Sequence, residues 1–157
     1  MRIDNANGTQ FRMNLPLTDV EQGSKERVAL LHQQEGTETI LLAEDDETVR
    51  FLIAQFLSDL GYQVITAEDG VDAVVKFLAH RDSIRFMLLD VDMPLRNGKD
   101  AFDEISRVRP GVKVLFMSDL TPDTLGDMSR EAGRDIIMKP FSLQDLKGKV
   151  LEMLSSA

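Results

Sequence analysis

The sequence predicts a doubly wound α/β fold, in which five parallel strands form one sheet and five helices cover its faces. From residue 39 onward, short apolar runs alternate with longer segments whose apolar residues recur at helical spacing. The apolar run at 86–89 is continuous, which is typical of a parallel strand buried on both faces of a sheet. Alternation of strands and helices implies right-handed crossovers, which place helices on both sides of the sheet.

The five expected strands are short and end at turns or at polar residues. Their expected ranges are 40–43, 62–66, 86–89, 113–117 and 135–138. The third strand is the most informative, because its apolar run leads directly to Asp90. Pro94 and the pair Asn97 and Gly98 then interrupt any regular structure. This strand is therefore expected at the centre of the sheet, with a carboxylate at its end.

Helical spacing of apolar residues predicts the five helices. The inward stripe of the first helix is expected to comprise Val49, Leu52, Ile53, Phe56, Leu57 and Leu60. The inward stripe of the second is expected to comprise Val71, Val74, Val75 and Leu78. The third and fourth helices are expected over about 99–108 and 122–133. Ser142 and Asp145 resemble a capping box that begins the last helix.

The residues before the first expected strand do not follow this regular pattern. Residues 9–15 alternate polar and apolar side chains, which is the period of a half-buried strand. The stretch 19–38 is mostly polar and is typical of a linker. We therefore divide the chain into a first arm over 1–18, the linker, and a domain over 39–157.

Composition limits the classes of function. The 157 residues include no cysteine, which excludes disulfides, thiolate metal sites and a cysteine nucleophile. The two histidines, His32 and His80, lie far apart in sequence, which argues against a zinc site. A formal net charge of −9 disfavours nucleic acid as a partner and direct contact with anionic membranes. No apolar run approaches the roughly 18 residues that span a bilayer. We therefore expect a cytoplasmic protein, with any membrane anchor elsewhere in a parent protein.

Residues with complementary chemistry follow four of the expected strands. Glu44 and Asp45 follow the first, Asp90 the third, Ser118 the fourth and Lys139 the fifth. The carboxyl ends of parallel strands meet at one edge, where open α/β sheets place their ligands. Three carboxylates there repel one another, and an oxygen-rich site open to water suits Mg²⁺. A hydroxyl and an ammonium complement the oxygens of a phosphoryl group, which makes Asp90 a candidate nucleophile.

Each of these residues also has a structural explanation when it is taken alone. An acidic run at a helix N-terminus interacts favourably with the helix dipole, and a serine after a strand often caps a helix or turn. A lysine before a proline is usually an ordinary surface residue. Their occurrence at successive strand ends favours the phosphoryl-transfer site.

Residues 39–157 resemble the receiver domain of two-component response regulators. The similar motifs are Leu-Leu-Ala-Glu-Asp-Asp at 41–46, Leu-Asp-Val-Asp-Met-Pro at 89–94 with Asn97-Gly98, Ser118, and Lys-Pro-Phe at 139–141. The resemblance implies a flavodoxin-like receiver fold and a phosphoacceptor function in two-component or phosphorelay signalling. The implied partners are the dimerisation and phosphotransfer domain of a histidine kinase or a histidine phosphotransfer protein.

The resemblance also implies a role for each site residue. Asp90 is the implied phospho-acceptor, and Ser118 and Lys139 are expected to contact the phosphoryl oxygens. The implied Mg²⁺ ligands are Glu44 (through water), Asp45, Asp90 and the backbone carbonyl of Asp92. The cofactor implied for this chain is therefore Mg²⁺.

Three further positions carry expectations from the same resemblance. The bond between Lys139 and Pro140 is expected to be cis. The family often has an aromatic switch residue three positions before the lysine, but this chain has Ile136, which has no ring to turn inward. Phe51 is expected on the exposed side of the first helix, which is the usual docking surface for the phosphohistidine partner in the family.

The first arm has a resemblance of its own. Residues 7–16 resemble the last strand of a histidine-kinase ATP-binding domain, although none of the ATP-contacting motifs is present. The order of kinase tail, linker and receiver is that of a hybrid sensor kinase. We therefore interpret the chain as the C-terminal piece of such a protein, which lacks the kinase core, and expect its receiver to be a phosphorelay intermediate.

Two alternatives stay open from the sequence. The run Asp-Val-Asp at 90–92 also resembles the nucleophile motif of haloacid-dehalogenase-type phosphatases. Against this alternative, the acidic pair precedes the nucleophile, and the chain after Asp90 is short for that larger core. The other alternative is a phosphorylation-independent interaction module. Degenerate receivers of that kind lose the acceptor, the acids or the lysine, and this chain retains them all.

Overall fold

The structure is a computed structural model, and it describes residues 37–119 and 133–155. The strands in these ranges are β1 (Thr39–Ala43), β2 (Gln63–Ala67), β3 (Ile84–Asp90), β4 (Lys113–Ser118) and β5 (Arg134–Met138). The helices are α2 (Glu47–Asp59), α3 (Gly70–His80), α4 (Gly98–Val108) and α6 (Leu143–Ser155). The strands form one parallel sheet in the order β2-β1-β3-β4-β5. The predicted doubly wound α/β fold is confirmed.

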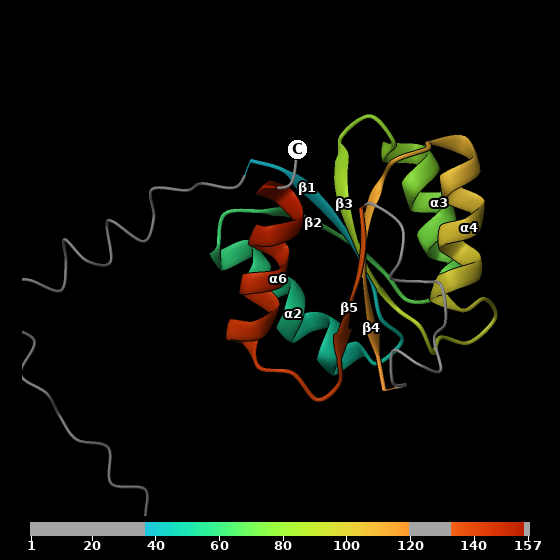
Figure 1. Ribbon diagram of the computed structural model, residues 1–157. Helices are drawn as coiled ribbons and strands as arrows, with labels where there is room; N and C mark the ends of the chain where they lie inside the picture. Colours follow the sequence, from blue (N-terminus) through green and yellow to red (C-terminus); the bar gives the residue numbers. More distant parts are fainter. Residues whose placement is uncertain (1–36, 120–132, 156–157) are drawn as a thin grey trace, which may run out of the picture. The chain divides into compact units, whose positions relative to one another are not determined.

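The helices lie on both faces of this sheet. Helices α3 and α4 cover one face, and α2 and α6 cover the other (Figure 1). From β1 the chain passes to β2 on one side and then returns to β3 on the other side of β1. The strand order therefore reverses between β1 and β3, where Ala43 and Leu89 lie opposite each other. Open α/β sheets bind ligands outside the carboxyl ends of the strands at such a point.

Each face of the sheet has its own apolar cluster. Successive residues of a strand point to opposite faces, so Leu41 and Leu89 pack beneath α3 and α4, whereas Leu42 and Leu88 pack beneath α2 and α6. These four side chains are fully buried. The prediction that the strand over 86–89 is buried on both faces is confirmed.

The inward face of α3 differs from the expected one. Val71, Val75 and Leu78 are between 41% and 59% exposed, and of the expected stripe only Val74 is buried. The residues of α3 that are buried are Gly70, Ala73, Val74 and Phe77. The helix is thus turned by one residue, about 100°. A Cβ at Gly70 would lie 2.2 Å from the carbonyl oxygen of Arg96, so close packing requires the glycine side to face inward.

The expected stripe of α2 is wider than the surface that the helix buries. Ile53 and Leu57 are buried, and Phe56 and Leu60 are partly buried against the same cluster. Val49 and Leu52 are exposed, contrary to the expectation. The helix therefore contacts the sheet along a narrow line and leaves apolar side chains at the surface.

Several expectations fall outside the described residues. They are the first arm, nearly all of the linker, and almost the whole of the fourth expected helix, over 122–133. Within the described ranges, no helix combines the length and the apolar character that a bilayer crossing needs.

Two glycines in helices provide a matched test of the packing. A Cβ at Gly98, the first residue of α4, would lie 2.1 Å from the carbonyl oxygen of Asp90, whereas Gly148 in α6 has open space around the same position. We expect Gly98→Ala to destabilise the fold by about 1–3 kcal/mol, because the backbone has to move. Gly148→Ala should stabilise it by up to about 1 kcal/mol through helix propensity. Urea unfolding followed by circular dichroism measures both, and wild-type stability of Gly98→Ala would contradict the close approach.

Candidate functional site

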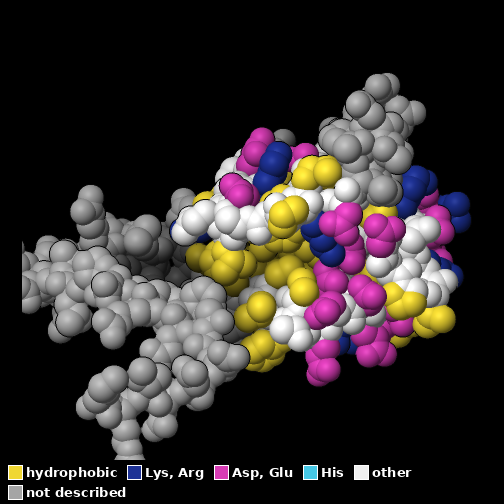
Figure 2. Space-filling view, turned by 90° about the horizontal axis from the view of Figure 1, so that it is seen from below, with side chains coloured by type: hydrophobic (Ala, Val, Ile, Leu, Met, Phe, Trp, Pro, Cys, Tyr) yellow, Lys and Arg dark blue, Asp and Glu magenta, His cyan; other side chains and the backbone are white. Residues whose placement is uncertain are grey.

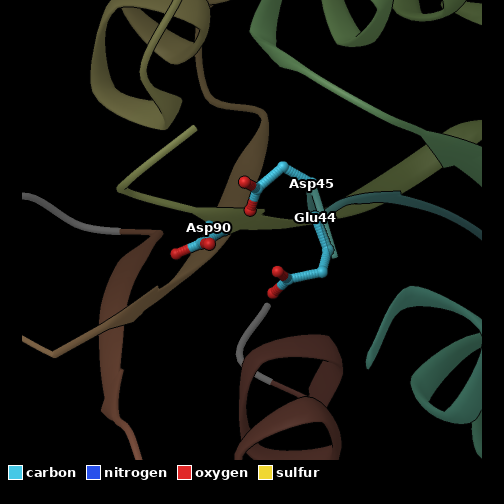
Figure 3. Close-up of side chains that lie close together, drawn as sticks. All are labelled: Glu44, Asp45 and Asp90. Atoms are coloured by element: carbon cyan, nitrogen blue, oxygen red, sulfur yellow. The ribbon is translucent and has the colours of Figure 1, made fainter. Parts of the chain in front are cut away.

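Strands β1 and β3 bring three acidic side chains to the carboxyl edge of the sheet. Glu44 and Asp45 directly follow β1, and Asp90 is the last residue of β3. Each offers a carboxylate oxygen, and these oxygens all lie within 4.8 Å of one another. Figure 3 shows the three side chains gathered around one space. The structure thus brings together the acids that the sequence placed at separate strand ends.

The environments of the three carboxylates differ. Glu44 and Asp90 are only 2% and 4% exposed, whereas Asp45 is open to solvent. The backbone N–H of Asp46 donates to Glu44 Oε1 at 3.3 Å, and the backbone N–H of Asp92 donates to Asp90 Oδ1 at the same distance. The cluster therefore combines two buried carboxylates with one that water can reach.

Lys139 joins the two buried carboxylates. Its Nζ lies 3.0 Å from Glu44 Oε2 and 3.0 Å from Asp90 Oδ2. The backbone N–H of Lys139 donates to the carbonyl oxygen of Ser118 at 2.8 Å, and the peptide bond to Pro140 is cis. Figure 2 looks at this edge and shows acidic side chains around a basic one, beside a hollow lined by hydrophobic side chains.

Burial and charge shift the ionisation of these groups. Burial raises the pKa of Glu44 above its ordinary value, the nearby Asp90 raises it further, and Lys139 partly counteracts both. Burial likewise raises the pKa of Asp90, against the hydrogen bond from Lys139. Burial by itself would lower the pKa of Lys139, but the hydrogen bonds to Asp90 and Glu44 raise it above its ordinary value. The amine of Lys139 thus stays protonated. Its single positive charge faces three carboxylates, so the cluster keeps an excess of negative charge.

Ser118 and Asp92 lie at the same edge of the sheet. Ser118 is the last residue of β4 and is fully buried. Asp92 is exposed, in the loop that follows Asp90. This loop is fixed by two backbone hydrogen bonds: Val91 N–H donates to the carbonyl oxygen of Met117 at 2.9 Å, and Gly98 N–H donates to that of Val91 at 3.1 Å.

Two further predicted positions, Ile136 and Phe51, are not part of the acidic cluster. Ile136 is in β5 opposite Phe116 and is partly buried against the cluster beneath α3 and α4. Phe51 projects from α2 and is 65% exposed. It lines an open groove of about 470 Å³ together with Glu47, Thr48, Arg50, Ala54 and Thr66.

The contacts of Arg50 at the site were not predicted from the sequence. Arg50 of α2 donates from Nη1 to the carbonyl oxygen of Glu44 at 2.5 Å and to that of Asp45 at 3.2 Å. A basic residue close to the N-terminus of a helix is disfavoured by the helix dipole. An arginine at this position therefore indicates a specific contact, but the sequence does not show which acceptors the arginine binds.

Residues 40–151 match the response regulator receiver domain family. The chain belongs to this family. The sensor kinase CckA of Brucella abortus is 30% identical over 156 residues, a match that covers 94% of this chain and 16% of that protein. The chain also spans only 44% and 52% of two further curated relatives.

Solved receiver structures share the fold. The receiver domain of the hybrid histidine kinase CckA has a TM-score of 0.65 and 26% identity, covering 74% of this chain and 99% of that one. The response regulator TrrA of Thermotoga maritima, in complex with Mg²⁺ and BeF, has a TM-score of 0.66 and 27% identity, with the same coverage. The function of this receiver domain is therefore in two-component signalling, and the phosphatase alternative is not supported.

The pKa shifts predict how stability depends on pH without divalent cations. Because the pKa values of Glu44 and Asp90 are raised in the folded state, their contribution to stability is full below the unfolded-state pKa values. It is lost as pH rises through the folded-state values. Glu44→Gln should therefore match the wild type near pH 4 and become relatively more stable toward pH 7. Urea midpoints in EDTA measure this, with the exposed Asp82→Asn as control. Parallel pH profiles for wild type and Glu44→Gln would contradict the expectation.

Proposed function

We propose that Asp90 accepts a phosphoryl group from a phosphohistidine, with Mg²⁺ as the cofactor. One observation carries the proposal. A buried carboxylate at the end of the central strand lies beside two further carboxylates and 3.0 Å from a lysine ammonium. A buried acid with only a structural role is stable when it pairs with one cation. Here three carboxylates face one ammonium, and this excess of negative charge indicates a site for a metal ion and a reacting group.

The chemistry follows from the positions of the polar groups. An Asp90 oxygen attacks phosphorus, the bond from phosphorus to the imidazole nitrogen breaks, and the imidazole leaves with the electron pair of that bond. Charge in such a transfer is spread over the three equatorial oxygens of the phosphoryl group. The ammonium of Lys139 and the hydroxyl of Ser118 would contact those oxygens, and their fixed positions avoid reorganisation during the transfer.

The donor set suits the proposed metal ion. Mg²⁺ prefers oxygen ligands, keeps several waters and takes few carboxylates. Asp45, Asp90 and the backbone carbonyl of Asp92 would hold it, with Glu44 acting through water. Bound Mg²⁺ would neutralise charge on the transferring group. The exposure of Asp45 leaves a path for the waters that such an ion retains.

Acetyl phosphate provides the direct test of the acceptor. With Mg²⁺ the wild type should gain one phosphoryl group by intact-mass spectrometry, and Asp90→Asn should gain none. Lys139→Ala should slow the gain by about 10²–10³-fold, because it removes a preorganised charge. Ser118→Ala should still gain a phosphoryl group. Asp82→Asn is the matched control, because it makes the same change at an exposed residue before β3, at the opposite end of that strand from Asp90. Wild-type stoichiometry in Asp90→Asn would overturn the proposal, and absence of phosphate in every variant would favour the phosphorylation-independent interaction module.

The comparisons also support an origin in a hybrid sensor kinase. The match to CckA covers 94% of this chain, whereas the receiver over 39–157 accounts for only about three quarters of it. The similarity thus extends into the first arm and linker. We propose that residues 1–18 end a kinase ATP-binding domain, that residues 19–38 link it to the receiver, and that the whole acts in the cytoplasm.

The proposed output is onward transfer of the phosphoryl group. Ile136 lacks the aromatic ring that commonly reports movement of the hydroxyl residue, which weakens a purely conformational output. An aspartyl phosphate is a reactive acyl phosphate, so its transfer to an imidazole is feasible. The partner would be the phosphotransfer domain of a histidine kinase or a histidine phosphotransfer protein.

The exposed Phe51 is the candidate contact for that partner, because α2 begins beside the acids and its groove is open. Phe51→Ser should slow transfer from a phosphohistidine protein, by about tenfold for a typical buried interface aromatic, but not from acetyl phosphate. Leu78→Ser is the matched control, an exposed apolar residue near the far end of α3. Equal slowing with both donors would reject docking at Phe51.

The same assay tests onward transfer, in which a labelled phosphoryl group should return from the receiver to the partner. Retained label in a phosphorylation-dependent complex would favour conformational output.

A further inference from the structure

Arg50 is the described side chain that contacts the backbone of both acidic residues after β1. It lies in α2, four residues after the N-cap Asp46, and its Nη1 reaches back to the carbonyl oxygens of Glu44 and Asp45. Side chains of a helix lean toward its N-terminus, which makes this return possible. The contact fixes the peptide units on both sides of Asp45 without using any carboxylate oxygen.

The rest of this turn is fixed by independent hydrogen bonds. Asp46 Oδ1 accepts from the N–H of Val49 at 2.9 Å, and the N–H of Glu44 donates to the carbonyl oxygen of Ala67 at 3.2 Å. Helix α2 therefore has its N-cap without Arg50. What Arg50 adds is restraint on the residue that carries the exposed carboxylate, Asp45.

We propose that Arg50 is a positioning residue for the metal ion, which aims the carboxylate of Asp45 at Asp90. The inference rests on the proposed Mg²⁺ site. It uses the principle that groups which orient a ligand commonly change metal affinity by 10–100-fold.

The sign of the effect separates positioning from simple charge. A cationic guanidinium near the site repels Mg²⁺, so its removal would tighten metal binding if charge were its only effect. Positioning has the opposite consequence for Mg²⁺ affinity. Without Arg50 the backbone of Asp45 is less restrained, and ordering it when the metal binds costs free energy. Arg50→Met should therefore weaken Mg²⁺ binding, against the electrostatic trend.

The experiment measures the Mg²⁺ dissociation constant of the unphosphorylated full chain by isothermal titration calorimetry. Arg50→Met should raise Kd about tenfold, and Arg50→Lys, which keeps a charged donor, should recover part of the loss. Arg107→Met is the matched control: it removes the same charge from the exposed last turn of α4, at the other end of the domain, and should leave Kd unchanged. Urea midpoints in EDTA establish that each variant is folded.

The outcomes separate this inference from the proposed function. Unchanged or tighter binding by Arg50→Met overturns the positioning role, as does weaker binding by Arg107→Met to the same extent. If Arg50→Met does not fold, Arg50→Gln is measured in its place, and unchanged or tighter Mg²⁺ binding by that variant overturns the inference. Wild type that binds Mg²⁺ but is not phosphorylated overturns the function alone. Wild type that binds no Mg²⁺ overturns the metal site and this inference together.

Discussion

The pairing of two buried carboxylates with one ammonium is the interaction on which the rest of the site depends. Glu44 and Asp90 are close enough to repel each other, and both are removed from water. Leaving such charges unpaired would be strongly destabilising. Strand β4 lies between β3 and β5, so the side chain of Lys139 has to reach across the end of β4 to pair with both. The order of the sheet and the length of a lysine are therefore matched to each other.

Backbone contacts hold the loops that carry the acids. Gly98 allows the first turn of α4 to pack against the carbonyl group of Asp90, and Gly70 allows α3 to pack against that of Arg96. Arg50 holds the carbonyl groups of Glu44 and Asp45. In each case a peptide group is fixed, so the carboxylates remain available for chemistry.

The strands and the position of the site could be predicted from the sequence because both follow from local patterns. The run that leads to Asp90 is apolar on both faces, and strand ends in a parallel sheet share an edge. The rotation of α3 could not be predicted, since two adjacent stripes of that helix are apolar. A tertiary contact at Gly70 decides between them.

Other features of the structure could not be predicted from the sequence. Arg50 donates to backbone carbonyl groups. Because every residue has such a group, the sequence does not indicate which ones the arginine binds. Val49 and Leu52 have the spacing of buried residues, but α2 touches the sheet along too narrow a line to bury them. The roles assigned to Asp90, Ser118 and Lys139 stay predictions, because they concern a reaction and not an arrangement of atoms.

The two apolar clusters have a consequence for how the domain unfolds. They are built from alternate residues of the same strands, as Leu41 and Leu42 illustrate. Removing one strand would open both clusters at once, so the helices on the two faces lose their packing surface together when the sheet comes apart. We therefore expect unfolding of the sheet to be cooperative across its two faces.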